Sequence, residues 1–220
     1  MRNWKELLPL IFALLSIVVL SSSNLKLKTA QWRRLRCQDN LQSLHRGALV
    51  YQEEHGGLFQ PVIVRSKPRW TYWYSFVLPY IDDPVVFYCP AHSRAEKMLE
   101  KDPGQSDLLP SLFDPHSLTY GMNYALSSSG DEKKASPPGN IRNIADPAYT
   151  IYFGDCKMPN PSLRPTKWCW KDDYAPVHED KANFVFIDGH VEAMNEDNLG
   201  LMHAFDEWKK DEKRWRNWKK

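Results

Sequence analysis

The chain has 220 residues, of which 42% are hydrophobic and 25% charged, so its composition supports a buried core and excludes a disordered protein. Its net charge of +2 excludes a chain that as a whole attracts polyanions, and we expect no nucleic-acid partner. Sixteen prolines, ten glycines and 13% aromatic residues favour a loop-rich fold with strands over a helical bundle.

The only long apolar run lies near the start, which excludes a transporter with several membrane spans. This run, Leu7–Leu20, carries no charge and follows the basic residues Arg2 and Lys5, a pattern typical of a secretory signal or membrane anchor. It is shorter than the ~20 residues of a straight transmembrane helix, and adding Ser21–Leu25 makes a marginal span. We therefore expect residues 1–25 to form an apolar signal or anchor helix.

Residues 26–56 are predicted to continue this helix in amphipathic form. Leu41, Leu44, Ala48 and Tyr51 recur at intervals of three and four, which places them on one apolar stripe. The two glycines at positions 56 and 57 are expected to end the helix. A globular β head is then predicted over residues 57–195, with strands at 85–88 and 150–153 and a short helix or strand at 70–78.

The clearest local prediction is a β-hairpin over residues 183–194. Two strand-like runs flank Asp188 and Gly189, a pair typical of a two-residue type I′ turn.

Residues 196–220 are predicted to form a C-terminal basic helix that docks one aromatic stripe on the head.

The four cysteines, Cys37, Cys89, Cys156 and Cys169, are widely spaced and form no C-x-x-C pair. Zinc sites usually use such close pairs, so the spacing favours disulfides in an oxidising compartment. Three pairings are compatible with four cysteines, and we expect Cys37 to pair with Cys89, and Cys156 with Cys169. Four ordinary buried thiols are the alternative.

His178 precedes Asp188 and Gly189 in an H-x9-D-G pattern, and His190 follows directly. His178, Asp188 and His190 are thus the candidate metal ligands, and the carboxylates around them, Asp155 among them, would suit calcium. We favour a structural role instead, in which Asp188 and Gly189 form a turn and His178 makes a hydrogen bond. The sequence contains no nucleophile, zinc-protease or phosphate-loop motif, so we expect neither an enzyme nor a catalytic residue.

Six ordered landmarks between residues 30 and 194 resemble the prepilin-type H-X9-DG family of exported pseudopilin-like proteins. The landmarks are C-Q-D-N-L at 37–41 leading to H-G-G-L-F at 55–59, L-P-Y-I at 78–81, C-P at 89–90, S-L-T-Y-G-M-N at 117–123, I-Y-F-G-D at 151–155, and H-x9-D-G at 178–189 with Asn183 inside it. The resemblance marks Gly154, Asp155, His178, Asn183, Asp188 and Gly189 as motif residues.

The resemblance implies a pilin-like α+β fold, in which a long N-terminal helix packs on an antiparallel sheet that carries long loops. Glu6 falls where the family keeps a buried glutamate that pairs with a neighbouring subunit, but Met1 and Arg2 stand where the family has glycine and phenylalanine. Cleavage by prepilin peptidase is therefore not implied, and we expect either an unprocessed anchored relative or a misplaced start.

The function that the resemblance implies is that of a structural subunit of a type II secretion or type IV pilus-like assembly. The chain would cross the cytoplasmic membrane once, hold its head outside, and associate with itself or other pilin-like subunits through the helix. A secreted module, released near Ser23 and binding glycan or another ligand through Trp70, Trp73, Trp168 and Trp170, is the alternative. A metal-dependent hydrolase built on His178, Asp188 and His190 is a third hypothesis.

Overall fold

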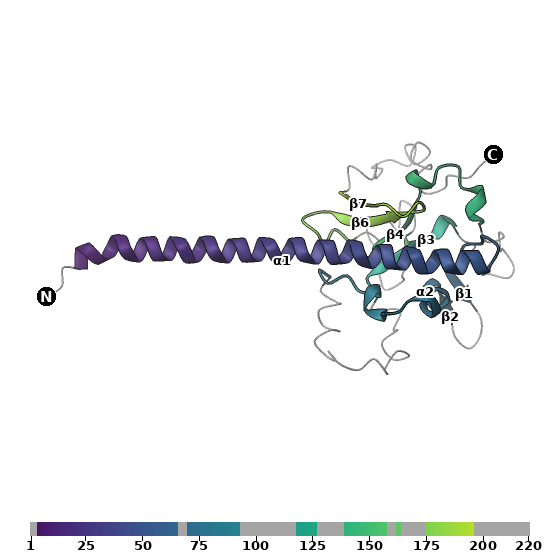
Figure 1. Ribbon diagram of the computed structural model, residues 1–220, viewed down its shortest axis with the longest axis horizontal. Helices are drawn as coiled ribbons and strands as arrows, with labels where there is room; N and C mark the ends of the chain where they lie inside the picture. Colours follow the sequence, from purple (N-terminus) through teal and green to yellow (C-terminus); the bar gives the residue numbers. More distant parts are fainter. Residues whose placement is uncertain are drawn as a thin grey trace.

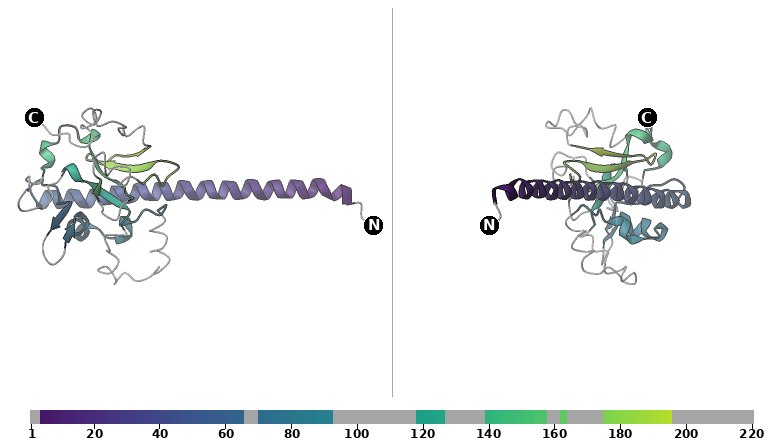
Figure 2. Two further views of the ribbon diagram at one scale, coloured as in Figure 1. Left: turned by 180° about the vertical axis from the view of Figure 1, so that it is seen from behind. Right: turned by 60° about the vertical axis from the view of Figure 1, so that its left-hand side comes forward.

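The computed structural model describes residues 4–65, 70–92, 118–126, 139–157, 162–163 and 175–195, and over residues 4–24 it describes the backbone alone. One helix, α1 (Trp4–Glu54), accounts for 51 of these residues. Its C-terminal half crosses the head, whereas its N-terminal half projects away from it (Figures 1 and 2). The predicted α+β class and the long N-terminal helix are confirmed. The predicted C-terminal helix at 196–220 lies outside the described residues.

Between residues 25 and 35, α1 carries exposed apolar side chains. Leu25, Leu27, Trp32 and Leu35 are each at least half exposed, at 66%, 62%, 60% and 50%. The apolar run Leu7–Leu20 and Glu6 lie closer to the N-terminus of α1, where the structure does not describe side chains. Among the residues that it does describe, no helix combines the length and the hydrophobicity needed to cross a membrane.

Helix α1 is continuous through Asp39 and Asn40, two residues with weak helix propensity. The Asn40 side chain is buried and donates a hydrogen bond to the carbonyl of Tyr88 at 2.9 Å, so it holds the head instead of competing with the helix backbone. The helix ends as predicted, because Gly56 takes a positive φ of 66° and the amide of Gly57 bonds to the carbonyl of Gln52 at 2.7 Å. This is a Schellman C-cap, which favours glycine at the left-handed position.

Two sheets and several short helices make up the head. Strands β1 (Ile63–Arg65) and β2 (Trp70–Tyr72) form an antiparallel pair. The larger sheet has the order β5-β3-β4-β6-β7, and all its pairings are antiparallel except that of β3 with β5. Its strands are β3 (Tyr120–Asn123), β4 (Ile151–Asp155), β5 (Ser162–Leu163), β6 (Ala182–Phe186) and β7 (Val191–Met194). The short helices are α2 (Trp73–Val77), η1 (Leu78–Tyr80), η2 (Pro84–Phe87), η4 (Tyr124–Leu126), η5 (Ile141–Asn143) and η6 (Pro147–Tyr149).

Of the strands predicted for the head, the one at 150–153 is confirmed and the one at 85–88 is wrong. The strand at 150–153 corresponds to β4, and residues 70–78 contain both of the predicted alternatives, a strand followed by a helix. The predicted strand at 85–88 is wrong, since these residues begin in the 3₁₀ helix η2. Pro84 fixes a helical φ at its first position, and the carboxylate of Asp83 accepts a hydrogen bond from the amide of Val85 at 3.0 Å.

The predicted hairpin is confirmed as β6 and β7, but the predicted turn type is wrong. A type I′ turn needs positive φ at both central residues, whereas only Gly189, at 92°, has one here. The amide of Gly189 bonds to the carbonyl of Phe186 at 3.0 Å, and the amide of Phe186 bonds to the carbonyl of His190 at 2.9 Å. This pattern is a longer connection in which glycine follows the turn and supplies the left-handed residue.

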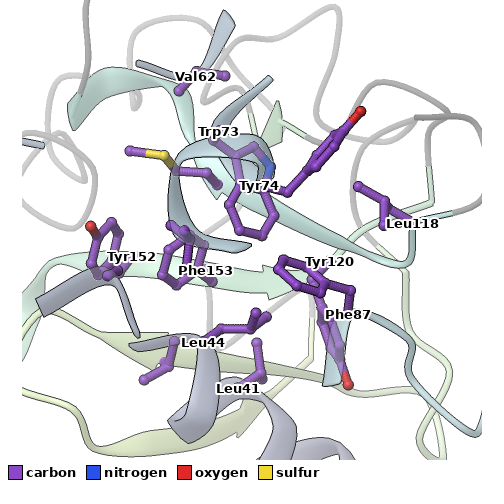
Figure 3. Close-up of a cluster of buried hydrophobic side chains, with 14 of the residues drawn as sticks. Leu41, Leu44, Val62, Trp73, Tyr74, Phe87, Leu118, Tyr120, Tyr152 and Phe153 are labelled. Carbon is purple, nitrogen blue, oxygen red and sulfur yellow. The ribbon is translucent and has the colours of Figure 1, made fainter. Parts of the chain in front are cut away.

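The core lies between α1 and the sheet, and the predicted stripe of α1 forms one side of it. Leu41, Leu44 and Ala48 are fully buried, and Tyr51 is nearly so. In Figure 3, Leu41 and Leu44 point from α1 toward the aromatic residues of the head, including Phe153. The other side is largely aromatic, and its largest members are Phe59, Trp73, Phe87, Tyr120, Tyr152 and Phe153.

His45 links α1 to the hairpin turn. Its Nε2 lies 2.9 Å from the carbonyl oxygen of Ile187, so the neutral ring donates a hydrogen bond there. Burial lowers the pKa of His45, and the nearby Arg46 acts in the same direction, while the Ile187 carbonyl and Asp188 oppose both. The folded protein therefore resists protonation of this ring.

We expect acidification to destabilise the fold through His45. Because the pKa is lowered on folding, the unfolded chain binds the proton first, so stability is fully present above the ordinary value of about 6.5 and falls as the pH drops toward the lowered folded pKa. Urea unfolding of the full chain at about pH 7.5 and about pH 5.5 would measure this loss. The His45→Gln variant keeps an amide donor but does not titrate, so it should lose less stability on acidification. Equal losses in the two proteins would contradict the prediction.

Candidate functional site

Four buried side chains from four separate segments meet beside α1. Cys37 comes from α1, Cys89 follows η2, Asp155 ends β4, and His178 precedes β6. One potential ligand atom from each residue lies within 4.8 Å of those of the other three. In the part of the chain that the structure describes, no other group of three or more such residues is placed to hold a metal ion. We call these four residues the Cys-His-Asp cluster.

Local structure fixes the position of each member. Cys37 lies one helical turn before Leu41, on the face of α1 that the head covers. The amide of Cys89 is held by the hydroxyl of Thr119 at 2.5 Å. His178 exchanges two backbone hydrogen bonds with Lys181, of 2.9 and 3.0 Å, across a tight turn.

The turn after His178 shows strain that the sequence did not indicate. Its central residues, Glu179 and Asp180, have positive φ angles of 53° and 62°. These are the angles of a type I′ turn, which glycine or asparagine adopts more easily. The type I′ geometry expected at Asp188 and Gly189 therefore occurs at the other end of β6, where it aims His178 at the cluster.

Short contacts join the polar atoms of the cluster. The Cys37 thiol donates to Asp155 Oδ1 at 3.3 Å, and the Cys89 sulfur lies 3.2 Å from His178 Nε2. The same Nε2 lies 3.6 Å from Asp155 Oδ2. Asn183 supports the cluster from β6. Its backbone amide donates a hydrogen bond to Asp155 Oδ2 at 2.7 Å, and its side-chain nitrogen donates one to the Cys37 sulfur at 3.2 Å.

Burial dominates the electrostatics of the cluster. It raises the pKa of Asp155 to about 7, although the amide of Asn183 and the two thiols pull the value down. Burial also raises the pKa values of both thiols, that of Cys37 strongly, and lowers the pKa of His178 to about 4 with help from Arg34. These directions all disfavour charge in a site without a bound cation.

The cluster does not have the arrangement of a nucleophilic triad. In a triad, the histidine uses one ring nitrogen for the nucleophile and the other for the carboxylate. Here Cys89 and Asp155 both face Nε2 of His178. The thiols are also fully buried, with raised pKa values, whereas a reactive cysteine is partly exposed and has a lowered pKa. Convergence of several donors on one point instead suits a bound cation.

The predicted metal trio is not brought together. Asp188 and His190 form an exposed pair, with 2.6 Å between Oδ1 and Nδ1, at the hairpin turn. His178 lies at the opposite end of β6, where it joins the cysteines and Asp155. The trio therefore supplies neither a metal site nor a hydrolase site, and two sulfur donors make the Cys-His-Asp cluster a poor site for calcium.

The cysteines behave partly as expected. Cys37 and Cys89 are neighbours, as the predicted pairing requires, but both are thiols here. Cys156 is a third buried thiol, and Cys169 lies outside the described residues. The two disulfides stay predictions.

The tryptophan surface predicted for the secreted ligand-binding module is not formed as expected at Trp73, because this side chain is fully buried in the core and cannot contact a ligand.

A small pocket of about 110 Å³ opens beside His178. It is lined by Ala30, Arg33, Arg34, Ala91, Val177, His178 and Glu179. Arg34 reaches Glu179 across it, at 3.9 Å. His178 is the one cluster residue in its lining, and the pocket is large enough for a few water molecules.

Comparisons of the chain with protein-family models, curated proteins and solved structures find no match.

Proposed function

We propose that this protein is a pilin-like structural subunit, anchored in the cytoplasmic membrane by the start of α1, with its head outside. It would belong to a type II secretion or type IV pilus-like assembly and would carry out no catalytic step. The observation that carries the proposal is α1 itself, an unbroken helix of 51 residues. At 1.5 Å per residue it is about 77 Å long, far longer than the head that it crosses.

The exposed apolar surface of α1 supports assembly through this helix. Leu25, Leu27, Trp32 and Leu35 remain exposed there, and a helix with such side chains gains stability by packing against another helix or by entering a membrane. The sequence adds the uncharged run Leu7–Leu20. Glu6 precedes it, and a carboxylate at the edge of a membrane is best accommodated by a cationic partner, such as the N-terminal amine of a neighbouring subunit.

Membrane fractionation and cross-linking of the full chain would test the proposal. We expect the protein to sediment with membranes and to form cross-linked multimers. Substituting alanine for Trp32 and Leu35 together should reduce the multimers, whereas Val85→Ala, which removes an exposed apolar side chain of the head, should not. Recovery of the head at mature size only in the soluble fraction would contradict the anchor and favour a secreted ligand-binding module.

A further inference from the structure

We propose that Cys37, Cys89, Asp155 and His178 bind one Zn²⁺ ion and that this ion fastens the head to α1. The site would be structural, because four protein ligands fill a tetrahedral shell and leave no open position for a substrate. This inference does not rest on pilin-like assembly, since every ligand comes from the same head and the part of α1 that it covers.

The spacing of the donor atoms is close to that of a zinc site. At the bond lengths that Zn²⁺ takes with sulfur, nitrogen and oxygen, tetrahedral ligands lie about 3.3–3.8 Å from one another. The cluster shows 3.3 Å from Cys37 Sγ to Asp155 Oδ1, 3.2 Å from Cys89 Sγ to His178 Nε2, and 3.6 Å from that nitrogen to Asp155 Oδ2. All four ligand atoms fall within 4.8 Å of each other, so an ion requires only small side-chain movements.

The charge balance also calls for a cation. Asp155 is fully buried, and no lysine or arginine among the described residues forms an ion pair with it. A buried carboxylate without a positive partner is costly, and a divalent ion at the centre of the cluster would remove that cost. Arg34 lines the adjacent pocket and would offset part of the excess negative charge of two thiolates and a carboxylate.

Asn183 provides the support that metal ligands usually have. Its backbone amide donates one hydrogen bond to the carboxylate of Asp155, and its side-chain nitrogen donates one to the sulfur of Cys37, so the residue orients two ligands at once. Hydrogen bonds of this kind fix ligand geometry and raise metal affinity. Asn183 lies within the H-x9-D-G stretch, between His178 and the hairpin turn, which gives this stretch a role at the site.

The donor set favours zinc over calcium, and an ion over a disulfide. Two thiolates and an imidazole prefer a borderline-soft ion that accepts tetrahedral geometry, whereas calcium requires six to eight oxygen ligands. A Cys37–Cys89 disulfide would use both sulfurs and would leave Asp155 and His178 together in the interior without a cation. The ion explains all four residues, and the disulfide explains only two.

Metal binding by the full chain would test the inference directly. The protein would be purified under reducing conditions without chelators, and its zinc content would be measured by mass spectrometry. We expect one zinc ion per chain. Replacement of zinc by Co²⁺ should produce the thiolate-to-cobalt charge-transfer absorption of a tetrahedral site. Absence of both signals from the wild-type chain would overturn the inference even if no variant folds.

Variants would assign the ligands. Cys89→Ser should lower the affinity for Zn²⁺ by more than about 100-fold, and Asn183→Ala by about 10–100-fold. Cys156→Ser and His190→Gln are the controls, because they remove a buried thiol and an exposed imidazole outside the cluster, and both should bind Zn²⁺ like the wild type. Equal loss in the controls, or a Cys37–Cys89 disulfide found by peptide mapping of the native protein, would overturn the inference.

Discussion

Replacement of Leu44 by alanine is expected to lower the free energy of unfolding by about 2–5 kcal/mol. Leu44 is fully buried on the stripe of α1 that faces the head, where it points at the aromatic core (Figure 3). Removing its branched end leaves a cavity between two rigid elements, a long helix and a sheet, which cannot easily close around it. Denaturant unfolding of the full chain would measure the loss.

Leu35→Ala is the matched control on the same helix. Leu35 is 50% exposed, so its truncation should change the free energy of unfolding by no more than about 0.5 kcal/mol. The same substitution, combined with Trp32→Ala, should weaken assembly, so the two leucines would separate folding from association. Similar destabilisation by Leu35→Ala and Leu44→Ala would show that the head does not pack on α1 in the way described.

Regular patterns in the sequence predicted the fold well where one element determines its own structure. The 3- and 4-residue spacing of Leu41, Leu44 and Ala48 located the buried face of α1, and two glycines located its end. The strand prediction at 85–88 failed, because Pro84 and the Asp83 cap favour a helical turn there more strongly than Val85 and Val86 favour a strand. The turn type failed because β-turn preference depends on the strand register as well as on Asp188 and Gly189.

The Cys-His-Asp cluster was beyond prediction from local spacing. Its members are spread from residue 37 to residue 178, and rules for metal sites depend on ligands that are close in the sequence. Only the packing of α1 against β4 and β6 brings Cys37 to Asp155 and His178. A signal was nevertheless present, because all four residues belong to the landmarks that carry the family resemblance.

Replacement of Gly154 by alanine is the substitution that should couple fold and site most strongly. Gly154 pairs with Phe184 between β4 and β6, and a Cβ atom at position 154 would lie 2.2 Å from Cδ1 of that ring and 3.1 Å from the Asn183 carbonyl oxygen. The ring is fully buried, so it cannot swing into solvent. We expect a loss of about 3 kcal/mol in the free energy of unfolding, at the upper end of the usual cost of overpacking.

The shift of β4 and β6 that the new methyl group forces should also disturb the cluster, because Asp155 follows Gly154 directly and Asn183 precedes Phe184 in the chain. Binding of Zn²⁺ by the Gly154→Ala variant should therefore weaken together with stability. Gly56→Ala is the control: a Cβ there meets nothing within 4 Å, so only the strain of its positive φ remains, about 1–2 kcal/mol, with no effect on the cluster. Adding Phe184→Leu should recover part of the stability that Gly154→Ala loses, since the smaller side chain vacates the space that the new methyl group needs. If Gly154→Ala matched the wild type in both stability and zinc affinity, the close approach of β4 and β6 would not be what holds Asp155 in place.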